Sequence, residues 1–140
     1  MHRFIAICFL LMCVPLFAFG EDEYAGEKKV MLDMIETVEI YNTAMSNAES
    51  TDEVARANNQ LSDNLEIHAP RMKALSDTYP EWGETPPDEI KPVMDRYMDV
   101  FTTFSLESLK KSVDYANTYP DDQELQDSYK RLNLIIMKLY

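Results

Sequence analysis

The sequence predicts an all-α protein: an up-down-up-down antiparallel four-helix bundle that follows a cleaved signal peptide. Two observations predict this class. Apolar residues recur at steps of three and four along residues 27–139, the spacing that places them on one face of an α-helix. No stretch alternates apolar and polar residues for long enough to indicate a strand. Short connections between successive helices favour antiparallel neighbours.

The first twenty residues are predicted to be a signal peptide. Arg3 gives a basic start, and residues 4–19 form an almost unbroken apolar run. Ala18 and Gly20 then occupy the small-residue positions of a cleavage site. We therefore expect an exported protein, periplasmic or extracellular, with a single domain over residues 21–140 and no stable membrane insertion after processing.

Composition excludes several classes of function. Both cysteines lie in the predicted signal peptide, so the mature domain has no disulfide, thiol nucleophile or cysteine-ligated zinc. The chain has 25 acidic and 13 basic residues and a formal net charge of −12, which makes nucleic acid and anionic membranes poor partners. It contains no glycine-rich phosphate loop and no supported Ser-His-Asp arrangement. We therefore expect a protein that is not an enzyme.

The first two helices are expected over residues 27–48 and 51–79. The apolar seam of the first consists of Met31, Met34, Val38, Tyr41, Met45 and Ala48. A capping box at Ser50–Glu53 opens the second helix. Its seam consists of Val54, Asn58, Leu61, Leu65, His68, Met72, Leu75 and Tyr79.

The other two helices are expected over residues 86–118 and 121–139. Thr85 can cap the first of these, and residues 121–124 form a capping box for the second. The apolar stripe of the third helix shifts by about 100° near Thr102–Ser105, so we expect a bend or a wide inward face there.

Two Thr-Tyr-Pro stretches mark helix ends. Tyr79 and Tyr119 each precede a proline, and a residue before proline is disfavoured in the helical conformation. Each ring is expected to fold back onto the end of the core. The second and third helices are longer than the other two, so they either project beyond the bundle or bend. We expect bends, at Pro70 and near Thr102–Ser105.

His68, the only histidine outside the signal peptide, is a candidate ligand. It lies on the seam near Pro70, which has no N–H to bond the carbonyl of Glu66. With Met72 one turn further on, it predicts a core site for a small ligand or for cuprous ion, which thioethers and imidazole bind. Alternatively, His68 satisfies that carbonyl or a buried tyrosine and fixes the register of the helices.

The predicted architecture resembles that of the small exported b-type cytochromes. These bundles hold haem between a methionine near the start of the first helix and a histidine in the fourth. Met31 or Met34 matches the methionine, but the fourth helix contains no histidine. The resemblance, which is one of shape, therefore implies haem only if His68 of the second helix is the ligand. No cofactor is expected.

Aromatic and thioether side chains offer a further candidate site. Met94 and Tyr97, with Phe101 or Phe104, can line a pocket for an organic ligand. Trp82, in the stretch PEWGETPP, is either an exposed contact for a partner or a cap on the end of the bundle. We therefore expect a non-catalytic binding or interaction module with a protein or small-molecule partner. The alternative is a carrier of a small ligand, copper or haem near His68.

Overall fold

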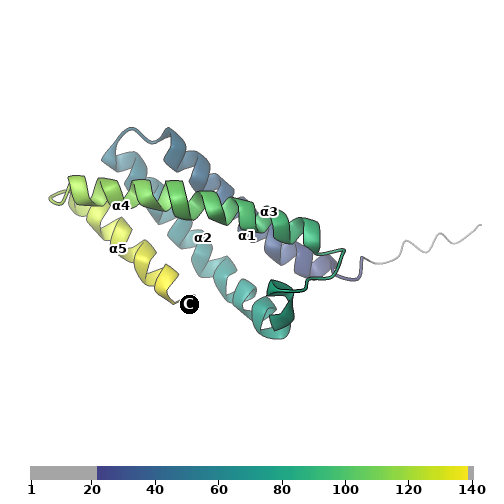
Figure 1. Ribbon diagram of the computed structural model, residues 1–140. Coiled ribbons are helices and arrows are strands. Elements are labelled where there is room, and N and C mark those ends of the chain that lie inside the picture. Colours follow the sequence, from purple (N-terminus) through teal and green to yellow (C-terminus); the bar gives the residue numbers. More distant parts are fainter. Residues whose placement is uncertain (1–21, 139–140) are drawn as a thin grey trace, which may run out of the picture.

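The computed structural model describes residues 22–138, and every regular element among them is helical (Figure 1). In chain order the elements are α1 (Ala25–Asn47), α2 (Thr51–Thr78), the 3-10 turn η1 (Pro80–Gly83), α3 (Lys91–Thr103), the π-turn η2 (Phe104–Ser108), α4 (Leu109–Thr118) and α5 (Gln123–Met137). Because α3, η2 and α4 are continuous, residues 22–138 form four long helical segments: α1, α2, α3–η2–α4 and α5. The predicted all-helical class is confirmed, whereas the predicted signal peptide lies outside the described residues.

Side-chain caps start α2 and α5. The predicted capping box is confirmed: Ser50 Oγ accepts from the Glu53 N–H at 3.4 Å, and Glu53 Oε2 accepts from the Ser50 N–H at 3.1 Å. At α5 the N-cap is Asp122, whose carboxylate accepts from the Leu125 N–H at 3.0 Å. This helix therefore begins two residues later than predicted, because Asp122 rather than Asp121 is at capping distance from its first turn.

The third helix begins later than predicted, at Lys91 instead of residue 86. Pro86 and Pro87 precede it in a non-helical connection, since each proline disfavours helical geometry in the residue before it. Pro92 takes the first turn of α3, where its missing N–H costs nothing. Ile90, just before the helix, is fully buried and anchors the connection.

The shift in the apolar stripe of the third segment falls at the π-turn η2. The Leu109 N–H donates to the Phe104 carbonyl five residues back, and the extra residue rotates later positions by about 100°. Leu109 therefore packs against the same core as Phe104. Asn42 of α1 holds this turn in place: it accepts from Ser108 Oγ at 2.7 Å and donates to the Val100 carbonyl at 3.1 Å.

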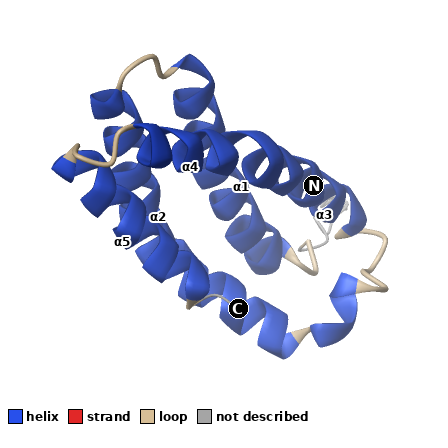
Figure 2. Cartoon of the chain, turned by 60° about the vertical axis from the view of Figure 1, so that its left-hand side comes forward, coloured by secondary structure: helices blue, strands red, loops and turns tan. Residues whose placement is uncertain are grey.

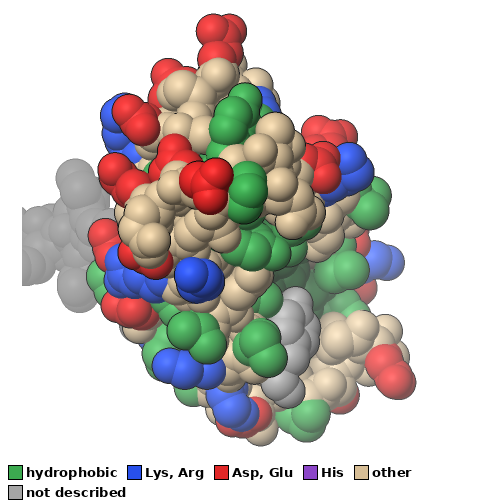
Figure 3. Space-filling view, turned by 90° about the vertical axis from the view of Figure 1, so that its left-hand side faces the viewer, with side chains coloured by type: hydrophobic (Ala, Val, Ile, Leu, Met, Phe, Trp, Pro, Cys, Tyr) green, Lys and Arg blue, Asp and Glu red, His purple; other side chains and the backbone are tan. Residues whose placement is uncertain are grey.

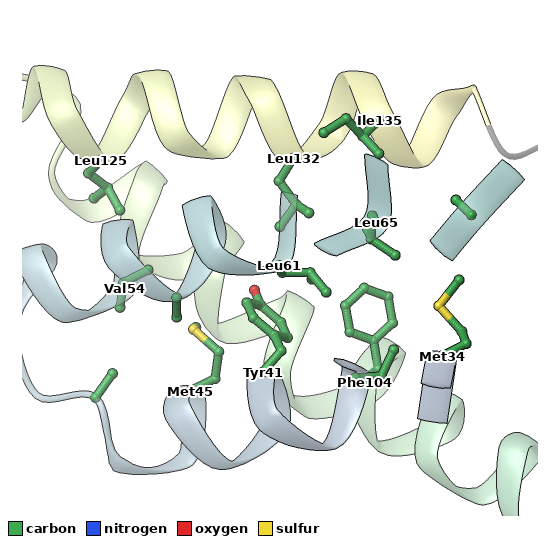
Figure 4. Packing of buried hydrophobic residues seen from close by; sticks show 14 residues of the cluster. Met34, Tyr41, Met45, Val54, Leu61, Leu65, Phe104, Leu125, Leu132 and Ile135 are labelled. Carbon is green, nitrogen blue, oxygen red and sulfur yellow. The ribbon is translucent and has the colours of Figure 1, made fainter. Parts of the chain in front are cut away.

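The helices pack in a closed order in which α1 contacts α2 and α3, and α5 contacts α2 and α4. Helices α2 and α5 run in the same direction, because residues pair in ascending order. Figure 4 shows these pairs as Val54 with Leu125, Leu61 with Leu132, and Leu65 with Ile135. Short connections predict that successive helices lie side by side and antiparallel. The connection between α2 and α3 is longer than expected, and within it η1 crosses the end of the molecule (Figure 1 and Figure 2).

Helix α5 covers only the first part of α2. All the buried residues of α2 lie at or before Ala69. Helix α5 ends at Met137, and Ile135, near this end, lies at the level of Leu65 (Figure 4). Helix α2 is continuous through Pro70 and runs on to Thr78. The second helix therefore projects past the fourth, and its last turns contact α1 and η1.

A polar network lies in the part of the core that α5 covers. Asn58 is fully buried. Its Oδ1 accepts from Tyr41 Oη at 3.0 Å and from Ser112 Oγ at 3.0 Å, and its Nδ2 donates to Ser128 Oγ at 3.3 Å. Burial raises the pKa of the Tyr41 phenol above its usual value. The network connects α1, α2, α4 and α5, and such a polar seam residue specifies the register of packed helices.

Candidate functional site

A pocket of about 460 Å³ lies where α2 projects past α5. Its volume is within the range of about 300–1,000 Å³ that is usual for small-molecule sites. Four elements supply its apolar walls: α1 gives Met31 and Met34, α2 gives Leu65, Ala69, Met72 and Leu75, the connection gives Tyr79, Pro80 and Trp82, and α3 gives Met94, Tyr97 and Phe101. Figure 3 shows a hollow with hydrophobic side chains on its walls and both acidic and basic side chains over the rest of this face.

The wall formed by the α2–α3 connection is held by aromatic packing. Trp82 stacks on Tyr79 with ring centroids 4.1 Å apart, and it forms a T-shaped pair with Tyr24 with centroids 5.4 Å apart. Tyr79 Oη donates to Glu27 Oε1 at 3.0 Å. This hydrogen bond to a carboxylate is the main cause that raises the pKa of Tyr79, and burial is the second. Trp82 is 5 % exposed. It therefore caps the end of the helices, and the alternative of an exposed partner contact is wrong.

Helix α3 supplies the opposite wall. Tyr97 stacks on Phe101 with centroids 4.2 Å apart, and Met94 lies one turn earlier on the same helix. No residue of α3 is fully buried, because no helix covers the pocket side of α3. Arg96 fixes α3 to α1 through its Nη2, which lies 2.9 and 2.8 Å from the two carboxylate oxygens of Glu39.

The charges of the pocket lie at its mouth. Lys73 and Asp77 form an ion pair at 2.7 Å, with side chains 62 % and 64 % exposed. Among residues 22–138, no buried side-chain nitrogen or oxygen lacks a hydrogen-bond partner. The walls of the pocket are mainly apolar, and the charged side chains of its lining lie at the rim.

His68 does not line this pocket. It is half-buried, and its Nδ1 lies 3.5 Å from Arg71 Nη1. Arg71 pairs with Asp33 of α1 at 3.0 Å, and the pKa of Asp33 is lowered first by Lys29 and then by Arg71. In the described part of the chain, no three His, Cys, Asp or Glu residues are grouped to hold a metal ion.

The structure brings together four of the five residues singled out in the sequence. Met72, Met94, Tyr97 and Trp82 all line the pocket, whereas His68 lies outside it. His68, which we expected on the seam of the core, is only partly buried, because α5 ends near this level of α2. The pocket does lie at the level of Pro70, since Ala69 and Met72 of α2 are in its wall.

Met31 and Met34 belong to the same pocket, although the sequence analysis placed them on the seam of the first helix and, as site residues, compared them only with a haem ligand. A signal for their position is present in the sequence. In an antiparallel helix pair, residues equally distant from the turn lie opposite each other. The turn between α1 and α2 spans residues 48–50, so Met34 faces the region of Leu65, and Met31 lies one turn further toward the pocket.

Comparisons with protein families, with curated proteins and with solved structures gave no match for this chain. Of the helices between residues 22 and 138, none combines the length and the apolar character needed to cross a membrane. The function is therefore inferred from the geometry of the pocket itself.

Proposed function

We propose that this protein is an exported, non-catalytic binding module whose apolar pocket holds a small organic molecule. The observation that carries the proposal is the pocket of about 460 Å³ with walls of methionine, aromatic and leucine side chains. The four helical segments act as one bundle domain over residues 21–140, after removal of the first twenty residues. The acidic surface keeps this domain soluble and away from nucleic acid.

Contacts outside the pocket support a site that exists before the ligand arrives. The Arg96–Glu39 pair holds α3 on α1, and the Tyr79–Glu27 hydrogen bond holds the connection on α1. A pocket whose walls are already in place loses less conformational entropy on binding. These contacts therefore favour a binding site over a packing defect.

The rival proposal, a copper or haem carrier that uses His68, has less support. The imidazole lies outside the pocket, next to Arg71. A guanidinium at this distance disfavours a bound cation by charge repulsion. The methionines that remain in the pocket have a sufficient role as adaptable apolar wall residues.

The proposal is tested with N-phenyl-1-naphthylamine, an apolar dye that fluoresces strongly when it leaves water. We expect saturable binding to the purified protein and a ligand-dependent rise in its melting temperature. Met72→Trp places a larger, aromatic side chain in the pocket, and it should abolish binding while the protein stays folded. Met98→Trp is the matched control, because Met98 is on α3 but 58 % exposed and does not line the pocket.

Two results would contradict this proposal. One is a wild-type protein that neither binds the dye nor gains thermal stability from it. The other is a folded Met72→Trp variant that binds the dye as tightly as the wild type and the Met98→Trp control do.

A further inference from the structure

We infer that the pocket selects a neutral aromatic molecule over an alkyl chain or an ion. This inference rests on the proposed function, and it is carried by two independent features of the pocket. One is the kind of atom that lines the walls. The other is where the charged groups lie.

Half of the lining residues carry polarizable groups. Eight of the sixteen lining residues are methionine or aromatic, and two are leucine. The methionines come from three helices, so a ligand meets thioethers on more than one side, and the stacked pair Tyr97 and Phe101 adds π-surface. Thioether sulfur makes favourable contacts with aromatic rings beyond those of an alkyl group of the same size. The walls therefore favour a ring system over a saturated chain.

The distribution of charge disfavours an ion. Lys73 and Asp77, the charged residues of the lining, pair with each other at the exposed rim. The Tyr79 hydroxyl is already engaged by Glu27. Burying an ionised group without a partner is costly, and the mainly apolar walls away from the rim carry no charged side chain to offset that cost. The buried part of the ligand is therefore neutral.

Matched probes test each half of the inference on the purified full chain. N-phenyl-1-naphthylamine and 8-anilino-1-naphthalenesulfonate share their ring systems and differ by a sulfonate. We expect the neutral dye to bind at least about tenfold more tightly. 2-Naphthol and 1-octanol each carry one hydroxyl and partition from water to similar extents. We expect 2-naphthol to displace the neutral dye at a several-fold lower concentration.

The double variant Met72→Leu/Met94→Leu keeps the volume of the pocket and removes two thioethers. It should weaken 2-naphthol binding roughly three- to tenfold and leave 1-octanol binding unchanged, whereas Met98→Leu should change neither. Equal binding of the two dyes, displacement by 1-octanol as good as by 2-naphthol, or equal loss of both alcohols in the double variant would overturn the inference while leaving a binding pocket. If no probe binds at all, the proposed function itself fails.

Discussion

The two halves of this molecule share α1 and α2 but are packed differently. In the closed half, α5 covers α2, and Leu61 and Leu132 are almost completely buried beside the Asn58 network. In the open half, beyond the end of α5, the seam residues Met72 and Leu75 of α2 are only partly buried and line the pocket. A difference in helix length is thus enough to turn a continuous seam into a core at one end and a cavity at the other.

This difference assigns separate tasks to the two halves. A close-packed core with a satisfied polar network specifies one arrangement of helices and supplies most of the stability. A cavity forgoes that packing energy, because its lining atoms have no partners on one side. The open half therefore contributes less to folding, and it retains apolar surface that a ligand can cover.

The largest expected effect compares leucines in the two halves. Leu61→Ala and Leu132→Ala should each lower the free energy of unfolding by about 2–5 kcal/mol, because each leaves a hole in a close-packed core. Leu75→Ala, in the pocket wall, should cost about 1 kcal/mol, because its side chain is only partly buried. Urea denaturation of the three variants measures this. Equal losses at Leu61 and Leu75 would contradict the division into halves.

The polar network of the closed half is tested by Asn58→Leu. This change leaves Tyr41, Ser112 and Ser128 without the partner they share, and we expect a loss of about 1–3 kcal/mol in the free energy of unfolding. Combining it with Tyr41→Phe should cost less than the sum of the two single changes, since both remove the same hydrogen bond. A double-mutant cycle in urea measures the coupling, and strict additivity would exclude a connected network.

Alkaline pH provides a milder test of the same half. Burial raises the pKa of Tyr41 in the folded protein, while an unfolded tyrosine titrates near about pH 10. The contribution of protonated Tyr41 to the free energy of unfolding is therefore complete below about pH 10, and it is lost as pH rises toward the pKa of Tyr41 in the folded protein. Relative to Tyr41→Phe, the wild type should lose up to about 1.4 kcal/mol per pH unit above about pH 10. Parallel stability curves for the two proteins would show that Tyr41 is not buried.

The sequence predicts the features of this fold that depend on neighbouring residues. The cap at Ser50 and the helix ends before Tyr79 and Tyr119 are confirmed, because capping and the effect of proline act within a few residues. The phase shift of the apolar stripe also locates the π-turn. The Tyr119 ring, however, is 48 % exposed instead of packing on the core, since that contact depends on which helix lies beside it.

The features that depend on tertiary packing were less predictable. Periodicity places His68 and Met72 on the same seam. That both side chains are only partly buried depends on where α5 ends, which periodicity does not predict. The start of α3 depends on which of three prolines takes the first turn, and Pro92 rather than Pro86 does so. The pocket itself requires Met31 to face α2 and α3 together, and this follows from how the helices pair across the molecule.

The smallest expected effect concerns His68, the second polar position on the seam of α2. Its one hydrogen-bond contact is a long one, 3.5 Å from Nδ1 to Arg71 Nη1, and Arg71 retains its ion pair with Asp33. We therefore expect His68→Leu to change the free energy of unfolding by less than about 0.5 kcal/mol, well below the effect of Asn58→Leu. It should also leave dye binding unchanged, because the imidazole does not line the pocket. Urea denaturation and dye titration of His68→Leu and Asn58→Leu, measured in parallel, test both expectations. A loss at His68 as large as at Asn58 would place the imidazole in the core, and a loss of dye binding would extend the site to His68.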